Sequence, residues 1–362
     1  MKPKKIIVSV SNDLFNDQRV HRICNSLQSN NYEVLLIGRN LKNSQNIEPR
    51  NYQTKRFSLL FNKGILFYLS LNIRFFFFLL FTKTDVLLSN DLDTLLCNTL
   101  VAGIKRKKLY YDSHELFTEV PELENRLVKK KIWLFIEKIC IRKTKISYTV
   151  CQPIADFYNQ KYVLNMNIIR NLPKKKAELI SFENRENFLI YQGVLNKERG
   201  IELLIEAMKY IPDYKLIIAG KGDLEKEFKD LSLSLNLIEK IIFTGNISIE
   251  KLHEYTSKAK LGFSIEQGKS LNYKYALPNK IFDYIQADVP VICANFPEMK
   301  KIVNTYNVGE IFYGNSAKEL AELINNLLDN ENKLKEYSEN CKKTKAVLNW
   351  ENEELKLLEL YQ

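Results

Sequence analysis

The chain has 362 residues, of which 45% are hydrophobic and 27% charged, a composition that excludes a disordered polypeptide and predicts two domains. Its net charge of +11 favours an anionic partner, such as nucleic acid, an acidic membrane surface or a phosphorylated substrate. No aromatic-interleaved basic module and no Cys/His finger occurs in the sequence, so a nucleic-acid partner is not expected. Six scattered cysteines and three histidines favour buried thiols and argue against a histidine-rich metal site. The first apolar run is too short for a secretion signal, so a cytoplasmic protein is expected.

Short apolar runs alternate with amphipathic runs along the first half of the chain. Strands are predicted at residues 6–10, 32–37, 85–89, 109–112 and 147–150, and a helix is predicted over residues 17–30. The element over residues 163–170 is expected to be the last before a break. Alternating β and α elements predict a parallel sheet with helices on both faces.

The segment 64–81, GILFYLSLNIRFFFFLLF, approaches the length of a membrane span. Asn72 and Arg74 lie in its middle, and a charge there costs about 2.5–3.5 kcal/mol on insertion into lipid. Three interpretations remain open: a helix packed on a domain face, a helix lying on a membrane surface, and a true span.

A polar, Lys-rich stretch at residues 171–187 predicts a linker, after which the alternation starts again. Strands are predicted at 188–191, 215–219, 241–244, 261–264 and 289–293, with helices at 201–208, 224–235, 249–255 and 280–286. Residues 350–362 predict an amphipathic helix. The sequence therefore predicts an N-terminal Rossmann-like domain (1–175), a C-terminal one (186–345) and a final segment (346–362) that crosses back to the first domain, with a cleft between the domains.

The strongest local signal is QGVLNKERG at residues 192–200, between a predicted strand and a predicted helix. Glycines let a backbone approach a ligand closely, and the start of a helix favours phosphate. Lys197 and Arg199 add positive charge suited to a diphosphate. A structural loop with two exposed cations is the alternative.

A second signal is YALPNKIFDY at residues 275–284, where Pro278 fits the start of a helix. Asn279 and Lys280 would then lie at a positive helix end that can hold phosphate, and Asp283 could accept bonds from ribose hydroxyls. The alternative is an ordinary first turn with an ion pair between Lys280 and Asp283.

These segments, taken with AGKG at 219–222 and FTG at 243–245, make the second half resemble the retaining glycosyltransferases of family 4, which have the GT-B fold. The resemblance implies an acceptor-binding first domain and a donor-binding second domain. It implies that Arg199 and Lys280 bind the donor diphosphate and that Asp283 replaces the glutamate that holds the ribose. The other donor-binding residues that it implies are Gly193, Asn196, Gly220, Gly222 and Asn279.

Two positions depart from the family pattern. The arginine after the first glycine is Val194 here, and the first glutamate of the two-glutamate motif falls on Tyr275. Glu266 is a nearby carboxylate out of register. Tyr275 and Glu266 are therefore the candidates for contact with the sugar.

The first half resembles the same family through DQRVHR at 17–22, Asn90-Asp91 and YDSHE at 111–115. Ligands of open α/β sheets bind beyond the carboxyl ends of the strands, where Asn90, Asp91 and Glu115 are expected to lie on the acceptor or sugar side. The resemblance implies that His114 faces the reacting sugar.

These features predict an enzyme of the EC 2.4 type that moves a sugar from a nucleoside diphosphate sugar to a glycan or lipid-linked acceptor, with retention, in bacterial polysaccharide or lipopolysaccharide synthesis. No cofactor or metal ion is expected, because side-chain cations can stabilise the leaving diphosphate. Peripheral contact with the inner membrane leaflet would suit a lipid-linked acceptor. The alternatives are a nucleotide-sugar epimerase of the same fold, using Asp91, Asp112 or Glu115, and a non-catalytic glycan- or nucleotide-binding protein.

Overall fold

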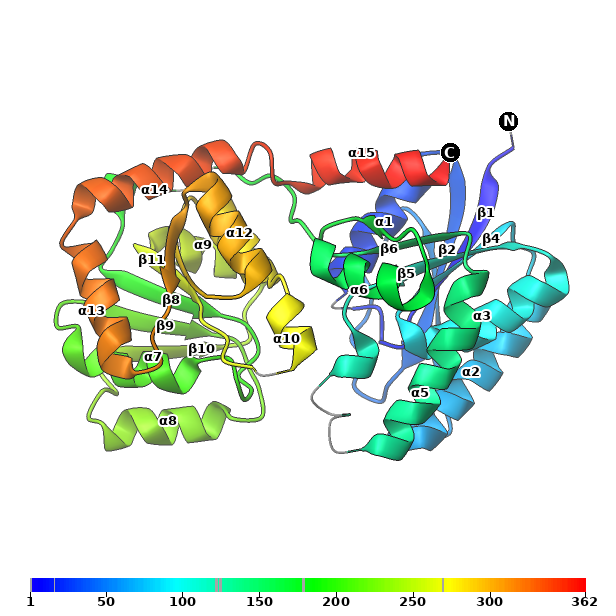
Figure 1. Cartoon of the computed structure of the whole chain (residues 1–362), viewed down its shortest axis with the longest axis horizontal. Helices are drawn as coiled ribbons and strands as arrows, with labels where there is room; N and C mark the ends of the chain where they lie inside the picture. The colour runs from blue at the N-terminus through cyan, green and yellow to red at the C-terminus, as the bar shows by residue number, and fades with distance from the viewer. Residues whose placement is uncertain (1, 16, 121–122, 124–125, 178–179, 269) are drawn as a thin grey trace. The chain divides into compact units, whose positions relative to one another are not determined.

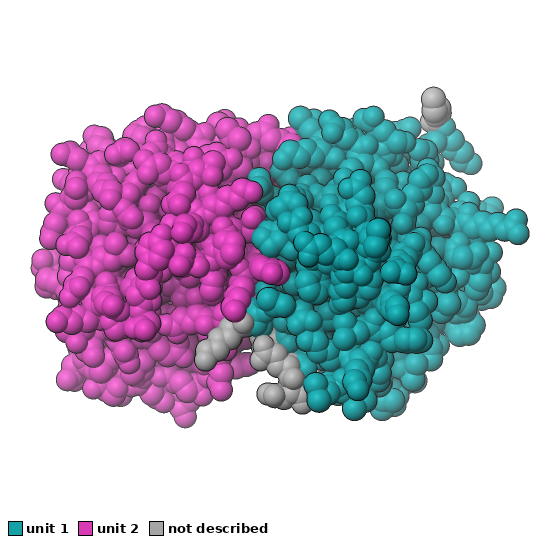
Figure 2. Space-filling model, viewed as in Figure 1, with its two compact units in different colours: residues 1–171, 270–272, 353–362 teal, residues 172–269, 273–352 magenta. Residues whose placement is uncertain are grey.

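The chain folds as two compact units, which Figure 2 colours separately. Unit 1 contains residues 1–171, 270–272 and 353–362, and unit 2 contains residues 172–269 and 273–352. The computed structural model describes residues 2–15, 17–120, 123, 126–177, 180–268 and 270–362. The chain passes from unit 1 to unit 2 where the polar stretch predicted as a linker begins.

Unit 1 is built on a seven-stranded parallel sheet in the order β3-β2-β1-β4-β5-β6-β7 (Figure 1). Its strands are β1 (Lys4–Ser9), β2 (Tyr32–Asn40), β3 (Gln53–Ser58), β4 (Val86–Asn90), β5 (Lys108–Ser113), β6 (Ile146–Thr149) and β7 (Asn167–Ile168). Its helices are α1 (Gln18–Ser29), α2 (Gly64–Phe81), α3 (Leu92–Lys105), α5 (Leu127–Cys140) and α6 (Gln152–Tyr162), with short 3₁₀ turns η1 (Phe117–Glu119) and η2 (Ile141–Lys143). The predicted parallel sheet of the first half is confirmed.

Unit 2 repeats this design with a six-stranded parallel sheet in the order β10-β9-β8-β11-β12-β13. Its strands are β8 (Phe188–Gln192), β9 (Lys215–Ala219), β10 (Ile241–Gly245), β11 (Leu261–Ser264), β12 (Val291–Ala294) and β13 (Gly309–Phe312). Its helices are α7 (Ile201–Ala207), α8 (Glu225–Ser234), α9 (Ile249–Lys258), α10 (Leu271–Tyr275, which begins in unit 1), α11 (Asn279–Gln286), α12 (Pro297–Tyr306), α13 (Ala317–Leu328) and α14 (Glu331–Thr344), with 3₁₀ turns η3 (Phe182–Asn184) and η4 (Met208–Tyr210).

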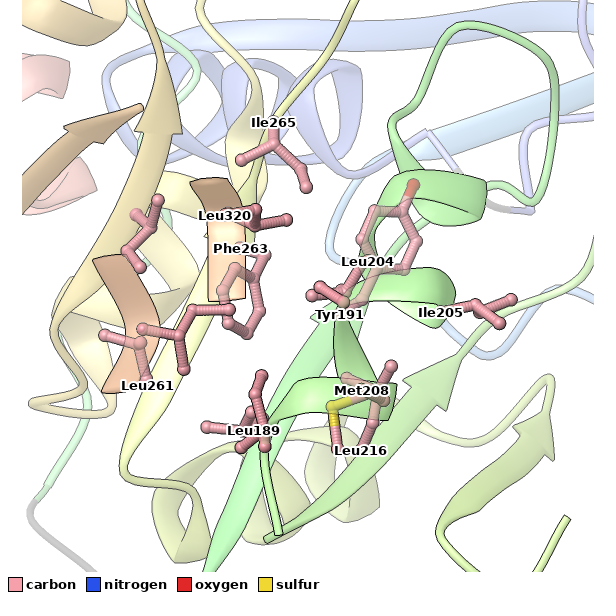
Figure 3. Close-up of a cluster of buried hydrophobic side chains, with 14 of the residues drawn as sticks. Leu189, Tyr191, Leu204, Ile205, Met208, Leu216, Leu261, Phe263, Ile265 and Leu320 are labelled. Carbon is pink, nitrogen blue, oxygen red and sulfur yellow. The ribbon is translucent and has the colours of Figure 1, made fainter. Parts of the chain in front are cut away.

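The core of unit 2 forms where the inner side chains of the strands meet α7 and α13. Leu189 and Tyr191 of β8 pack with Leu204 of α7, Phe263 of β11 and Leu320 of α13 (Figure 3). All five are essentially inaccessible to solvent. This packing fixes the carboxyl ends of β8 and β11, which carry the candidate site.

The apolar segment 64–81 is helix α2, packed on α3 along one side. It buries Phe67, Leu71, Phe75 and Leu79, one residue in every four, as expected for a helix with one covered face. By length and composition alone α2 could also cross a membrane, but one such helix is weak support for a span. The structure packs α2 on a face of unit 1, with 22% of the helix buried.

The C-terminal helix α15 (Trp350–Tyr361) contributes its last residues to unit 1. The Tyr361 ring is buried against the rings of Tyr32, Tyr110 and Tyr148. Tyr32 donates its hydroxyl to the Tyr361 carbonyl at 2.6 Å, and the hydroxyls of Tyr148 and Tyr361 are 3.0 Å apart. The end of the chain is thus part of the core of unit 1.

Candidate active site

The loops that follow β8, β9 and β10 are hydrogen-bonded to one another at the edge of the unit 2 sheet. Gly193 N donates to Ala219 O at 2.9 Å, and Gly220 N donates to Gly245 O at 3.0 Å. Gly220 has a φ of 145°, and a Cβ on it would lie 1.9 Å from the Gly193 carbonyl oxygen. Only glycine fits at this position. The hydrogen bonds bring the glycine-containing segments predicted from the sequence together in one place.

Two of the predicted donor-binding residues hold these loops in position. Asn196 Oδ1 accepts a hydrogen bond from Asp223 N at 3.0 Å, which joins the loop after β8 to the loop after β9. Gly222 lies directly against the backbone of Leu195. Their observed contacts are with the chain itself, and they shape the loop surface that Gly193 exposes.

A buried ion pair lies between the ends of β8 and β11, where strand order in the unit 2 sheet switches direction. Ligands of open α/β sheets bind at such switch points. Lys280 Nζ of α11 is 2.8 Å from Glu266 Oε1, and Ser264 Oγ donates to Glu266 Oε2 at 2.9 Å. The Lys280 ion pair is thus with Glu266, and the alternative of a pair between Lys280 and Asp283 is not what the structure shows.

The surroundings keep Lys280 and Glu266 charged. Burial alone would lower the pKa of Lys280, but the Glu266 carboxylate raises it above its ordinary value. Burial likewise opposes ionisation of Glu266, and Lys280 holds the pKa of that carboxyl below its ordinary value. The Lys280 amine is 4.2 Å from the centre of the Tyr191 ring and lies 3.7 Å from where a Cβ on Gly193 would be. The missing side chain of Gly193 therefore leaves a ligand a path to the amine.

Arg199 adds a second cation to this cluster. Its Nη1 is 3.9 Å from Glu266 Oε1, and its guanidinium lies 5.1 Å from the centre of the Tyr273 ring. Arg199 Nε is shielded from water and has no hydrogen-bond acceptor among the residues that the structure describes. Two cations share one carboxylate, which leaves a net positive charge where an anion could bind.

Helix α11 begins at Asn279, directly after Pro278, as the sequence predicts. Asn279 is exposed at the first position of the helix, where backbone N–H groups have no partner within the helix. One turn later, Asp283 Oδ2 accepts from Gln192 Nε2 at 3.1 Å, and Gln192 Oε1 accepts from Thr256 Oγ1 at 2.8 Å. Asp283 is therefore tied to the end of β8.

The structure separates the two candidates for contact with the sugar. Glu266 contacts Lys280 directly, although it is out of register with the family pattern. Tyr275, which is in register, is the half-buried last residue of α10. The carboxylate beside the predicted diphosphate-binding residues is thus Glu266.

In unit 1, Asn90, Asp91 and His114 come together at the carboxyl ends of β4 and β5, beside the switch point between β1 and β4. Asn90 Nδ2 donates to Ser9 O at 3.2 Å, which ties β4 to β1. Asp91 has a φ of 58°, a costly value for a residue with a side chain. Its carboxylate accepts from His114 N at 2.8 Å and lies 3.2 Å from His114 Nδ1.

The second ring nitrogen of His114 is engaged as well. His114 Nε2 is 3.3 Å from Asp112 Oδ2, and Arg19 holds the same carboxylate through Nε at 3.0 Å and Nη2 at 2.8 Å. Burial alone would lower the pKa of His114, but Asp91 and Asp112 raise it well above its ordinary value. Both ring nitrogens of His114 are therefore engaged by carboxylates, an arrangement that favours the protonated ring and suits a fixed cation better than a base.

Two acidic residues beside this cluster have different surroundings. Glu115 Oε2 accepts from Asn272 Nδ2 at 3.0 Å, within unit 1. Asp93 is buried in α3, where desolvation and the nearby Asp91 raise its pKa to about 7.

Sequence reasoning missed Arg19 and Tyr191. Arg19 could have been noticed because it lies next to Val20 and Ile23 on the apolar face of the predicted helix. A charged side chain on such a face needs a buried partner. No local sequence pattern indicates a role for Tyr191, because its ring lies beside the Lys280 amine only once β8 and α11 are packed together.

Comparisons with known proteins fit this geometry. Residues 174–344, a range that covers most of unit 2, match the family model described as Glycosyl transferases group 1. The uncharacterized glycosyltransferase MJ1069 of Methanocaldococcus jannaschii is 24% identical over 357 residues, which cover 89% of this chain and 88% of that protein. The O-antigen chain mannosyltransferase RfbU of Salmonella typhimurium is 26% identical over 184 residues, 49% of each chain.

The chain spans about half of RfbU, and 29% and 54% of two other curated relatives. Among solved structures, Anabaena HepE in complex with UDP and glucose has a TM-score of 0.77 at 15% identity, with 98% of each chain covered. The predicted α/β fold of the GT-B type is thus confirmed, and the chain is similar to glycosyltransferases, with the match to Glycosyl transferases group 1 lying at residues 174–344.

Proposed function

We propose that the chain transfers a sugar from a nucleoside diphosphate sugar to a hydroxyl of a glycan or lipid-linked acceptor, with retention at the anomeric carbon. The observation that carries the proposal is the paired cations Arg199 and Lys280, which share the single carboxylate of Glu266 beneath the exposed Gly193. A diphosphate would find there two cations and the exposed loop backbone around Gly193.

The reaction builds negative charge on the departing diphosphate. Arg199 and Lys280 would stabilise that charge where it develops, which is usually the largest electrostatic contribution to such a reaction. Because the cations are part of the chain, we propose that the transfer needs no metal ion. The leaving phosphate itself would take the proton of the acceptor hydroxyl.

The relatives support the substrate classes. RfbU is named for an O-antigen chain, and the HepE structure holds UDP and glucose. We therefore propose a role in bacterial cell-surface polysaccharide or lipopolysaccharide synthesis on the cytoplasmic side of the membrane, with peripheral contact at the inner leaflet.

A donor screen tests the proposal. Purified protein is incubated with UDP-, GDP-, ADP- and dTDP-sugars, with and without a membrane lipid extract, and released nucleoside diphosphate is followed. We expect release from one donor class, enhanced by the extract, lost in Arg199→Ala and Lys280→Ala, and retained in Lys318→Ala, an exposed lysine of α13. Chelation by EDTA should leave the rate unchanged, and proton NMR should show the anomeric configuration of the donor in the product.

Other outcomes point elsewhere. Conversion of a nucleotide sugar without any acceptor would indicate the epimerase. Nucleotide binding without release from any donor would indicate a non-catalytic protein.

A further inference from the structure

Helices α2, α3 and α5 form one layer over the unit 1 sheet (Figure 1). Helix α3 contacts both α2 and α5, and the rings of Tyr68 in α2 and Trp133 in α5 meet edge to face, with centroids 4.9 Å apart. The outer surface of the layer is therefore continuous across the three helices.

That outer surface is apolar. In α2, Leu69, Ile73 and Phe77 recur every fourth residue opposite the buried stripe, and each is 50–55% exposed. Outward apolar side chains continue on the neighbouring helices, with Ile104 at the end of α3 60% exposed and Phe135 of α5 65% exposed. Large contiguous apolar patches on a protein surface usually mark a binding site.

Polar contacts hold α2 in this layer and argue against a span. Asn72 Nδ2 donates to Asp93 O at 2.8 Å, and Asn72 Oδ1 accepts from Cys97 N at 3.1 Å, both in α3. Lys105 Nζ donates to Leu79 O and to Thr82 O at the end of α2. A membrane-spanning α2 would lose these bonds and its buried stripe.

The same layer concentrates positive charge. Residues 60–83, 92–108 and 126–145 contain 15 lysines and arginines and two acidic residues, a surplus of 13, whereas the whole chain has a surplus of 11. The two acidic residues, Asp93 and Glu137, are both buried. The exposed charge of the layer is thus entirely positive, which attracts anionic lipid headgroups and opposes pairing with a second copy of the same face.

We propose that the α2–α3–α5 face is a membrane-docking surface that lies in the plane of a bilayer containing anionic lipids, an inference that rests on the peripheral membrane contact of the proposed function. Its apolar side chains would enter the headgroup boundary while its lysines and arginines contact the headgroups. Because docking is measured without sugar donor or acceptor, its failure and the failure of the transfer reaction are separate results.

Vesicle flotation tests this surface. The full chain is mixed with vesicles of phosphatidylcholine alone or of phosphatidylcholine with phosphatidylglycerol, at low and high salt. We expect the chain to float with the anionic vesicles and to float less at high salt. Salt screens the attraction between the cations and the headgroups, whose range is already only about 8 Å at physiological ionic strength.

Two variants test the apolar centre and the cations of this face. Ile73→Glu with Phe77→Glu should weaken binding at least about tenfold, because two apolar anchors are lost and two negative charges are added. Lys129→Gln, Lys131→Gln and Lys138→Gln together should weaken it about 100-fold, since each surface cation contributes about 1 kcal/mol and each 1.4 kcal/mol is tenfold.

Matched controls come from unit 2. Leu233 and Ile238 are each 58% exposed, so Leu233→Glu with Ile238→Glu makes an equivalent change outside the face. Lys226→Gln, Lys251→Gln and Lys318→Gln remove three exposed lysines there. Both controls should float like the original chain, and thermal unfolding checks that every variant is folded.

Three results would overturn the proposal. One is an absence of flotation by the original chain with anionic vesicles. Another is an equal loss in the control variants. The third is a concentration-dependent dimer in sedimentation that Ile73→Glu with Phe77→Glu dissociates, which would make the face a contact between copies of the chain.

Discussion

The two units place charged clusters at equivalent positions, beside the switch points of their sheets, but balance them differently. In unit 1, Arg19 and His114 face Asp112 and Asp91, so cations and carboxylates are equal in number. In unit 2, Arg199 and Lys280 share Glu266 alone. A balanced, hydrogen-bonded cluster fixes backbone segments, whereas an unbalanced one retains attraction for an anion. We therefore expect the first cluster to stabilise unit 1 and the second to attract an anion.

The largest effect is expected from Arg19→Met in unit 1. Removing the guanidinium leaves the fully buried Asp112 without its main partner, which should lower the free energy of unfolding by about 3–5 kcal/mol. Chemical denaturation measures the change. Lys229→Met, which breaks the exposed pair with Glu225, is the control and should cost less than about 1 kcal/mol. Equal effects of the two substitutions would contradict a stabilising role for the unit 1 cluster.

Lys280→Met should lower turnover by about 10²–10³-fold, the usual cost of removing one group that stabilises developing negative charge. It also leaves Glu266 buried beside Arg199 alone, so stability will fall as well. Combining it with Glu266→Gln removes that uncompensated charge. The double variant should regain stability without regaining turnover. Recovery of both would show that the charged cluster of unit 2, like that of unit 1, stabilises the fold and does not take part in the reaction.

His114→Gln tests the charge balance in unit 1 through pH. The folded pKa of His114 is raised, so its charged form stabilises the fold fully below the unfolded pKa of about 6.5, and this contribution is lost as pH rises through the folded pKa. Each tenfold gain in the proton affinity of the folded imidazole adds about 1.4 kcal/mol to that contribution. The difference in unfolding free energy between the original chain and the variant should thus be larger at pH 6 than at pH 9. A difference that does not change with pH would contradict a charged His114 in the folded protein.

The smallest effect is expected from Gly193→Ala. Gly193 has a φ of 138°, so a side chain adds backbone strain of about 1 kcal/mol, and its Cβ would lie 3.7 Å from Lys280 Nζ. We expect weaker donor binding, seen as a higher KM, with little change in kcat. Val194→Ala, at the next and exposed position, should change neither constant.

Much of the fold could be predicted from local patterns. The strands at residues 215–219 and 261–264 were placed at their observed limits, because buried parallel strands are short apolar runs bounded by polar residues. Strand β3 was missed because five of its six residues are exposed or half-buried and mostly polar, and β13 because Gly309 and Glu310 leave only two apolar residues in it. Edge strands carry too little apolar pattern to stand out.

The site was predicted only in part. Arg199 and Lys280 follow from loop and helix signals within short segments. The partner of Lys280 did not, because Glu266 reaches it only when β11 packs beside β8. The pairing of Arg19 with Asp112 joins residues 93 positions apart, and no local pattern reports such a contact.

The burial of Tyr361 in the core of unit 1 has a consequence for synthesis. Domains generally fold as units while the chain emerges from the ribosome, the N-terminal one first. Here the later turns of α15, which are translated after unit 2, complete the unit that is translated first. Unit 1 therefore cannot finish folding until α15 has emerged from the ribosome, and a substitution in α15 would destabilise the N-terminal unit although it lies far from that unit in the sequence.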